Sequence, residues 1–328
     1  MLSQRKMIVW LALVLFTASA SASPLVYVVT GSQQFGTLDL ATGAFHPIGP
    51  DTPEGDGGLV AGPNGSLLAV TFSGTLDSII PATAVTSVVG VTGFADCTSP
   101  TSPCGPTSFG ALGKLGGTIY GTDFGGNLYT VNAATGATTL IGHTGIPAVP
   151  AIPSTTNPDG SLNVFTESLF GAGGKLYATF DADTLDPVSF AATPVIPARL
   201  YQINPSTGLA TVLAPTTLGL SAVVEVNGTI YAFNVATSQV VTLNLANGNT
   251  SFVSNLDPSA GSIGGAVSIP AAVPEPASMA LAGIGIAAIA ICRRRRRHST
   301  CSLLAPRWTL QLSRHSGSTL AARSWEIT

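Results

Sequence analysis

Acidic side chains supply most of the chemically active groups in this sequence. Glu167 and Glu225 each lie beside a short apolar segment, and they are the catalytic candidates if the protein is an enzyme. A carboxylate in a cleft can act as a general acid or base. Between residues 23 and 272, however, histidine and arginine are too scarce to stabilise an anionic transition state readily. We therefore expect no catalytic residue, and an enzyme is the alternative.

Two acidic clusters raise the question of calcium. Closely spaced carboxylates can converge on Ca²⁺, which takes about six to eight oxygen ligands in irregular geometry. The clusters are Asp181, Asp183 and Asp186, and Asp51, Glu54 and Asp56. Neither fits an EF-hand loop, because Leu185 occupies a ligand position in the first cluster and a later Glu is missing. We expect solvated loop acids and no cofactor, with Ca²⁺ at Asp181, Asp183 and Asp186 as the alternative.

The charge balance of residues 23–272 restricts the partners of this region. It contains 14 acidic and 3 basic residues, a net charge of −11. Nucleic acid is excluded as a partner, because binding it requires many cations that neutralise phosphates. Gly, Thr, Val, Ser and Pro dominate, and no Glu/Lys pairing on a helical apolar stripe is present. This composition predicts an all-β domain.

A turn motif recurs along this domain. It places Asp or Asn four residues before Gly, in residues 38–43, 131–136, 203–208 and 243–248, with a degenerate copy at 79–84. The Asx side chain is expected to cap the turn, while Gly takes the positive φ that a side chain would resist. These Asp and Asn residues are therefore assigned a structural role. Three of the copies are followed by a second glycine, namely Gly49, Gly90 and Gly142.

Further short motifs complete each repeat. A Gly-initiated strand precedes most copies of the turn motif, at residues 65–69, 117–121, 174–178 and 228–232, and an apolar leading strand precedes each of these at 58–61, 108–111, 168–171 and 221–224. Four short strands joined by tight turns form one blade of a β-propeller. Residues 181–197 read as an insertion between the middle strands of the fourth blade. The units resemble the repeats of bacterial extracellular propeller proteins.

The ends of the domain predict how the ring closes. The first unit begins at residue 25 without a leading strand, and residues 263–267 form an unpaired strand at the other end. That C-terminal strand is expected to complete the first blade and remove an exposed edge. Five blades result. A six-bladed ring stays open because residues 143–163 are unassigned, and a sandwich or solenoid is the alternative fold.

Both chain ends read as processing segments. Arg5 and Lys6 precede an apolar stretch at residues 7–16, which predicts a signal peptide over 1–22 with cleavage between Ala22 and Ser23. Near the other end, an uncharged run at 277–291 would form a transmembrane helix roughly 20–25 Å long. Two short elements flank this run, first Val273, Pro274, Glu275 and Pro276, and afterwards Arg293, Arg294, Arg295, Arg296 and Arg297.

The order of these three elements over residues 273–297 resembles the PEP-CTERM sorting signal of bacterial exported proteins. The resemblance implies a membrane protease of the exosortase type as a partner, cleavage near Pro-Glu-Pro, and delivery to the cell surface or the extracellular polymer. It implies an inner-membrane anchor before processing. An ordinary single-pass anchor is the alternative. Residues 298–328 extend beyond the usual end of such signals, and they read as disordered or as an artefact of the gene boundary.

Cysteine usage agrees with export. Cys97 and Cys104 bracket a Pro/Ser/Thr-rich segment, and an oxidising compartment favours a disulfide between them. Taken together, the sequence predicts an extracellular propeller domain at 23–272, processed by signal peptidase and exosortase. We expect it to act as a structural or binding module of the envelope or the extracellular polysaccharide matrix. The alternative function is a propeller lyase or hydrolase acting on polysaccharide or a lactone.

Overall fold

The computed structural model of the chain describes residues 23–51, 56–96, 107–147, 162–185, 188, 192–217 and 219–269. The chain divides into two units, residues 1–270 and 271–328, and the described residues all belong to the first. The predicted signal peptide, transmembrane helix, arginine run and tail lie outside the described residues. Within the described ranges, no helix is long and apolar enough to cross a membrane.

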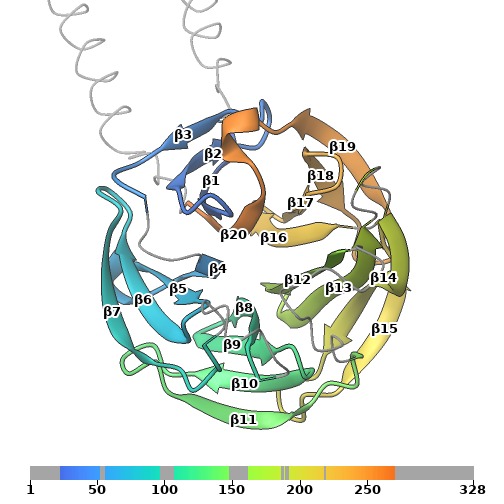
Figure 1. Cartoon of the computed structure of the whole chain (residues 1–328), viewed down its shortest axis with the longest axis horizontal. Coiled ribbons are helices and arrows are strands. Elements are labelled where there is room, and N and C mark those ends of the chain that lie inside the picture. Colours follow the sequence, from blue (N-terminus) through green and yellow to red (C-terminus); the bar gives the residue numbers. More distant parts are fainter. Residues whose placement is uncertain are drawn as a thin grey trace, which may run out of the picture. The chain divides into compact units, whose positions relative to one another are not determined.

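The described residues form five four-stranded antiparallel sheets, arranged as the blades of a ring (Figure 1). Blade 1 contains β20 (Ile263–Ser268), β1 (Leu25–Thr30), β2 (Phe35–Asp39) and β3 (Phe45–Pro47). Blade 2 contains β4 (Asp56–Ala61), β5 (Leu67–Thr71), β6 (Thr75–Ile80) and β7 (Val85–Val91). Blade 3 contains β8 (Phe109–Leu115), β9 (Thr118–Asp123), β10 (Asn127–Val131) and β11 (Thr138–His143).

The remaining blades complete the ring, and each blade is written with its innermost strand first. Blade 4 contains β12 (Leu162–Ala172), β13 (Lys175–Leu185), β14 (Ala192–Ile203) and β15 (Ala210–Pro215). Blade 5 contains β16 (Leu220–Val226), β17 (Thr229–Asn234), β18 (Gln239–Leu243) and β19 (Thr250–Asn255). Two short 3-10 helices, η1 (Pro63–Gly65) and η2 (Pro258–Ala260), lie in connections between strands. The all-β propeller predicted from the repeats is thus confirmed, with five blades.

The first blade is a hybrid of both chain ends, as predicted. Strand β20 pairs antiparallel with β1, so that Val26 lies opposite Ser268 and Val28 opposite Ala266. In consequence the strand that begins the domain is held between its own hairpin partner β2 and the strand that ends the domain. This pairing closes the ring and leaves no free edge on β1.

The strand directions define two faces of the ring. All five innermost strands end at one face, where those of blades 2 to 5 meet tight turns to the second strands; we call this the turn face. They begin at the opposite face, which receives the connections from the preceding blades; we call this the loop face. Because β1 starts and β20 ends at the turn face, both ends of the described propeller leave from that side.

The Asx turns form as the motif predicts. Asn132 Oδ1 accepts hydrogen bonds from the backbone N–H groups of Ala134 at 2.9 Å and Thr135 at 3.2 Å. Gly136 has φ +76° and donates its N–H to the Asn132 carbonyl at 2.8 Å. In the degenerate copy, Ala84 occupies the glycine position and still adopts φ +57°. The turn geometry is therefore retained even where the preferred residue is absent.

The second glycine of the repeat has a packing role between blades. A Cβ atom on Gly90 in β7 would overlap the carbonyl oxygen of Thr135, which belongs to the Asx turn of blade 3. Gly142 in β11 is related in the same way to Thr207 of blade 4. Each of these outer strands thus lies directly against the Asx turn of the next blade. The glycine spacing of the sequence reflects this close backbone contact.

The hydrophobic core is divided among the blade junctions. Among the described residues, the buried apolar side chains form five clusters, and each cluster joins residues of two neighbouring blades. At the junction of blades 5 and 1, Phe233 of blade 5 packs in the same cluster as Val28 and Ile263 of blade 1, and all three are at most 1% exposed. Burial between blades, not within one sheet, therefore stabilises the ring.

Blade 4 differs from the others in the length of its strands. Strands β12 and β13 pair over eleven residue pairs, from Leu162 with Leu185 to Ala172 with Lys175. The predicted insertion at residues 181–197 lies between the middle strands, as expected, but much of it extends β13 and β14 as a longer hairpin. This extension rises at the loop face and places Asp181 and Asp183 in a strand.

Candidate functional site

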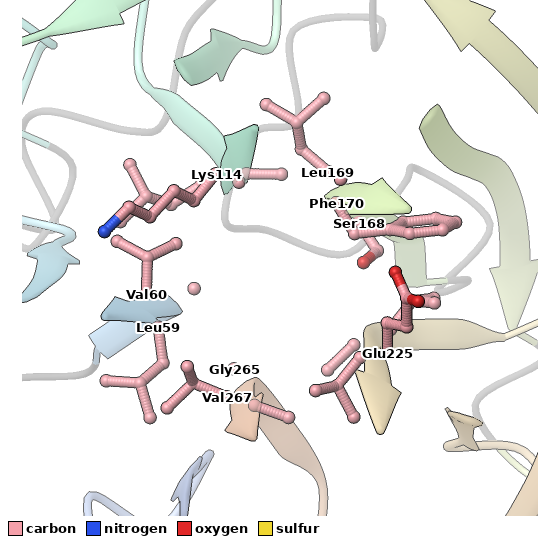
Figure 2. A pocket seen from close by; sticks show the side chains of 18 of the residues that line it. Leu59, Val60, Lys114, Ser168, Leu169, Phe170, Glu225, Gly265 and Val267 are labelled. Atoms are coloured by element: carbon pink, nitrogen blue, oxygen red, sulfur yellow. The ribbon is translucent and has the colours of Figure 1, made fainter. Parts of the chain in front are cut away.

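The innermost strands of all five blades surround a central channel, with a cavity of about 530 Å³ (Figure 2). Its wall is largely backbone and apolar side chain, including Leu59, Val60, Phe170 and Val267. Glycines occur repeatedly in these strands. They let neighbouring strands approach so closely that a Cβ atom on Gly113 or Gly171 would overlap a backbone carbonyl of an adjacent blade.

Lys114 supplies the positive charge of the channel wall. Its Nζ donates a hydrogen bond of 2.6 Å to the Ala61 carbonyl oxygen at the end of β4. The side chain therefore links blade 3 to blade 2 near the turn face. Figure 2 shows Lys114 and Glu225 reaching from different walls of the channel. The two charges are separated by blade 4, because Lys114 lies in β8 and Glu225 in β16.

Glu167 lies on β12 in the channel wall, and the pKa of its carboxyl group is strongly raised. Its Oε1 accepts a hydrogen bond of 2.6 Å from Thr122 Oγ1 of blade 3. The carboxyl group covers Gly110, where a Cβ atom would overlap Oε2. Burial raises the pKa of Glu167 to about 7, the Thr122 hydrogen bond opposes the rise, and the nearby charge of Asp123 adds to it. A carboxyl group with this pKa can donate or accept a proton near neutral pH.

Asp123, at the end of β9, is a structural neighbour of Glu167. It is 1% exposed, and its carboxylate accepts hydrogen bonds from the backbone N–H and side-chain amide of Asn127 at 2.8 and 2.9 Å. Tyr129 Oη donates to it as well, at 2.8 Å. Burial, together with this carboxylate, raises the pKa of Tyr129 to about 12. Asp123 thus orders the turn between β9 and β10 and is fully engaged.

The two predicted catalytic candidates both line the channel, but at different depths. Glu167 pairs with Phe180 of β13, whereas Glu225 pairs with Ile230 of β17. In β13, the residue equivalent to Ile230 is Leu176, which lies four residues before Phe180. At about 3.3 Å per residue, the two glutamates are offset by roughly 13 Å along the channel. This exceeds the separation of about 5 to 10 Å between the carboxyl groups of glycosidase pairs.

The interpretation of Asp181 and Asp183 as solvated loop acids is wrong. Both lie in β13 and are buried, with 3% and 8% of their surface exposed. The insertion lengthens the hairpin of blade 4, and so the acids follow strand geometry. Asp186 lies outside the described residues. Among the described residues, no group of three or more His, Cys, Asp or Glu side chains converges on a point that would hold a metal.

The second acidic cluster is only partly described. Asp51 is exposed at the loop face, Glu54 lies outside the described residues, and Asp56 is the first residue of β4 with its side chain outside them. The predicted disulfide residues Cys97 and Cys104 also lie outside. So does Ala22, whereas Ser23 is described, and its Oγ donates to Asp39 Oδ1 at 2.7 Å.

Sequence reasoning missed the partners of Glu167. Thr122 and Asp123 end the second strand of blade 3, and Asp123 takes the position that Thr30 has in blade 1 and Thr71 in blade 2. Thr71 Oγ1 accepts a hydrogen bond from the Thr75 N–H at 3.2 Å, as Asp123 does from Asn127. The sequence did offer one sign of these residues, since a polar residue recurs just before the turn that follows the second strand. The hydrogen bond between blades 3 and 4 could not be predicted, because Thr122 and Glu167 are 45 positions apart.

Comparison with solved structures gives weak likenesses. A chain of the nidogen/laminin complex is 12% identical, with 75% of this chain and 98% of that chain covered and a TM-score of 0.43. A Bacteroides thetaiotaomicron protein of unknown function is 13% identical, covering 69% and 57%, with a TM-score of 0.39. A catalytically inactive virginiamycin B lyase from Staphylococcus aureus with quinupristin is 11% identical, with 71% of this chain and 71% of that chain covered and a TM-score of 0.36.

None of these likenesses carries information about the function of this chain. The sequence matches no curated protein at a significant level. The match to the PEP-CTERM protein-sorting motif, in contrast, covers residues 272–297 and includes the predicted Val273, Glu275 and arginine-run residues. This motif implies an exported protein that is sorted by an exosortase and transiently anchored in the membrane. The chain is therefore a five-bladed β-propeller that carries a PEP-CTERM sorting motif at its C-terminal side.

Proposed function

We propose that this chain is a structural or binding module of the bacterial envelope or extracellular polysaccharide matrix, released there by exosortase cleavage at Pro274-Glu275-Pro276. The position of the sorting motif carries the proposal. The motif begins at residue 272, shortly after the last described residue, Ile269. Cleavage at the Pro-Glu-Pro element would therefore leave every described strand, including the closing strand β20, in the released product.

The direction of the chain ends supports a binding role for the loop face. Both ends of the described propeller leave from the turn face, so the loop face carries neither of these ends. The connections between blades and the extended hairpin of blade 4 belong to the loop face. Loops positioned by a rigid scaffold are the usual carriers of binding functions.

The charge of the domain suggests the class of ligand. Because residues 23–272 carry a net charge of −11, neutral or amine-bearing glycans suit this domain as ligands better than polyanions do. The channel, of about 530 Å³, offers backbone groups, apolar walls and a few charged side chains, which suits a small polar ligand or the end of a glycan chain. We therefore place the binding of matrix polysaccharide at the loop face and the mouth of the channel.

The first test is the mass and the terminal peptides of the protein recovered from the envelope and medium of its native host. We expect a product that begins at Ser23 and ends near Pro274. A product that still carries residues Arg293 to Arg297 would overturn the sorting step. Deletion of the exosortase gene in the same host is the matched control, because it should retain the uncleaved form in the membrane.

The second test addresses binding itself. The exported protein should cosediment with the host's insoluble extracellular polysaccharide, and added soluble polysaccharide should compete. A propeller that stays entirely in the supernatant would contradict the binding role. A heat-unfolded sample controls for nonspecific adsorption.

An enzyme is the second candidate, favoured by one observation. Glu167 lies in the channel wall with a pKa raised to about 7 by burial, as suits a general acid or base. If it is an enzyme, incubation with matrix polysaccharides or lactones releases products, and Glu167→Gln abolishes the release. Glu225→Gln then shows whether the second channel acid takes part. No product from any of these substrates would leave the binding role as the function.

A further inference from the structure

Asp183 has an unusual position for a carboxylate. It lies in the strand extension of blade 4 and is 8% exposed. Among the described residues, its Oδ1 is the one buried side-chain nitrogen or oxygen atom with no hydrogen-bond partner. Burying an unpaired carboxylate oxygen is costly unless the group is protonated or binds a cation.

Asp181 lies two positions earlier on the same strand and is 3% exposed. Side chains two residues apart in a strand leave from the same face, so the two carboxyl groups are neighbours. Asp181 Oδ2 accepts a hydrogen bond of 3.0 Å from the Gly219 N–H, and Oδ1 accepts from the hydroxyl of Thr166 on β12. Burial raises the pKa of both aspartates, and the charge of Asp183 contributes further to the rise at Asp181.

No cation of the described residues compensates these charges. Lys114 donates to Ala61 in the channel, and Lys175 to Gln202 at the exposed edge of the turn face. Arg199 pairs with Phe180 across β13 and β14, so its side chain leaves from the face opposite to Asp181. None of the three contributes to the pKa of either aspartate. Two neighbouring buried acids therefore lack a counter-charge.

We propose that Asp183, Asp181 and Thr166 bind a Ca²⁺ ion. The donors are all oxygen atoms, which select a hard cation. Ca²⁺ fits better than Mg²⁺, because Ca²⁺ accepts about six to eight oxygen ligands in flexible geometry, whereas Mg²⁺ requires near-octahedral geometry and gives up its bound waters reluctantly. The cation is coordinated by Asp183 Oδ1, the buried oxygen that has no hydrogen-bond partner, and backbone carbonyl oxygens and water complete its coordination. This site is independent of the proposed binding and sorting functions.

The ion would have a mechanical consequence for the ring. Asp181 also binds Gly219, which immediately precedes the first residue of β16 in blade 5. Fixing Asp181 by a cation therefore fixes the point at which the chain passes from blade 4 to blade 5. We expect Ca²⁺ to rigidify this junction and to slow hydrogen exchange of the Gly219 amide.

The test uses the exported protein after removal of metal with EDTA. Calorimetric titration should detect one Ca²⁺ per chain, and about a hundredfold excess over Kd should raise the Tm by about 5 °C. Mg²⁺ at the same concentration should change the Tm much less. Asp183→Asn should abolish binding and the Tm response. Asp51→Asn, in the exposed acidic cluster, is the matched control and should retain both.

Three results would overturn the proposal. The first is wild-type protein that neither binds Ca²⁺ nor melts later in its presence, which would indicate that the aspartates are protonated instead. The second is undiminished binding by Asp183→Asn, and the third is loss of binding in Asp51→Asn. If Asp183→Asn does not fold, Thr166→Val keeps both carboxylates and should weaken the affinity for Ca²⁺ about tenfold. Unchanged affinity in that variant would also contradict the site.

Discussion

At the scale of single residues, Glu167 makes the stability of the propeller depend on pH. Its pKa is about 7 in the folded chain, against an ordinary value of 4.5 in an unfolded one. Between these values the unfolded chain releases a proton that the folded chain keeps, so folding becomes less favourable as pH rises. We expect wild-type Tm to fall between about pH 4.5 and 7, and Glu167→Gln to reduce this fall, with a Tm higher by a few degrees at pH 8.

A second substitution checks that the effect arises at Glu167. Thr122→Ser keeps the hydroxyl that donates to Glu167 and should preserve the pH profile, whereas Thr122→Val removes a hydrogen bond that lowers the pKa of Glu167. The valine variant should shift the loss of stability to higher pH. Thermal unfolding by circular dichroism from pH 4 to 9 measures all four proteins. Identical pH profiles in wild type and Glu167→Gln would contradict the assignment.

The Asx turns give a residue-scale prediction of a different kind. Asn132→Ala removes the acceptor of two backbone N–H groups, those of Ala134 and Thr135. Loss of such a cap costs about 1 kcal/mol, which corresponds to a Tm decrease of roughly 2–4 °C in a domain of this size. Asn132→Asp is the conservative control, because the equivalent residue Asp39 caps its turn in the same way. The two variants are compared with wild type by differential scanning calorimetry.

These residues also show where reading the sequence succeeded. The Asx cap at Asn132 was predictable because its geometry is local and its sequence signal recurs in four of the five blades. The burial of Asp181 was not predictable, since the same residues would be solvated in a loop and are covered only when the hairpin is extended. Glu167 was found as a channel acid from its place beside a leading strand. Its hydrogen bond to Thr122 depends on the alignment of two blades, which no local pattern encodes.

At the scale of elements, the contact between an outer strand and the next Asx turn controls the blade junctions. Gly142→Ala should place a Cβ atom against the Thr207 carbonyl oxygen, and both partners are backbone-fixed. Such overlap costs about 1–3 kcal/mol, so we expect Tm to decrease by about 3–10 °C. Gly117→Ala is the control, because no atom lies within 4 Å of the position that its methyl group would take and its φ is not positive.

The result separates packing from backbone effects. Both substitutions replace a strand or turn glycine with the same residue, and they differ in what the new methyl group meets. Equal Tm values for Gly142→Ala and Gly117→Ala would show that the outer strands have room between the blades. The glycine spacing in the sequence predicted the repeat, but not this contact, because the partner Thr207 belongs to another blade.

At the scale of the whole molecule, the number of blades followed from repeat counting, and closure followed from the unpaired strand at 263–267. The blade number and the closure both follow from the pairing of four strands in each blade. The first unit of the sequence lacks one strand, and one unpaired strand is left at the end of the domain. A six-bladed ring remained an alternative, because residues 143–163 were not assigned to any strand from the sequence. The structure removes that alternative because Leu162 onward extends the innermost strand of blade 4.

Closure by β20 yields the last prediction. A chain ending at Ile269 keeps the hybrid blade and should fold cooperatively without the sorting motif. A chain ending at Leu256 loses Ile263, which is 1% exposed, and leaves the edge of β1 unpaired. We expect the shorter chain to melt at least about 10 °C lower or to aggregate, since it loses a buried strand and exposes the junction of blades 5 and 1. Calorimetry and light scattering distinguish these results. Equal, cooperative unfolding of both chains would show that the ring is held by the other blade junctions, and that exosortase cleavage need not spare β20.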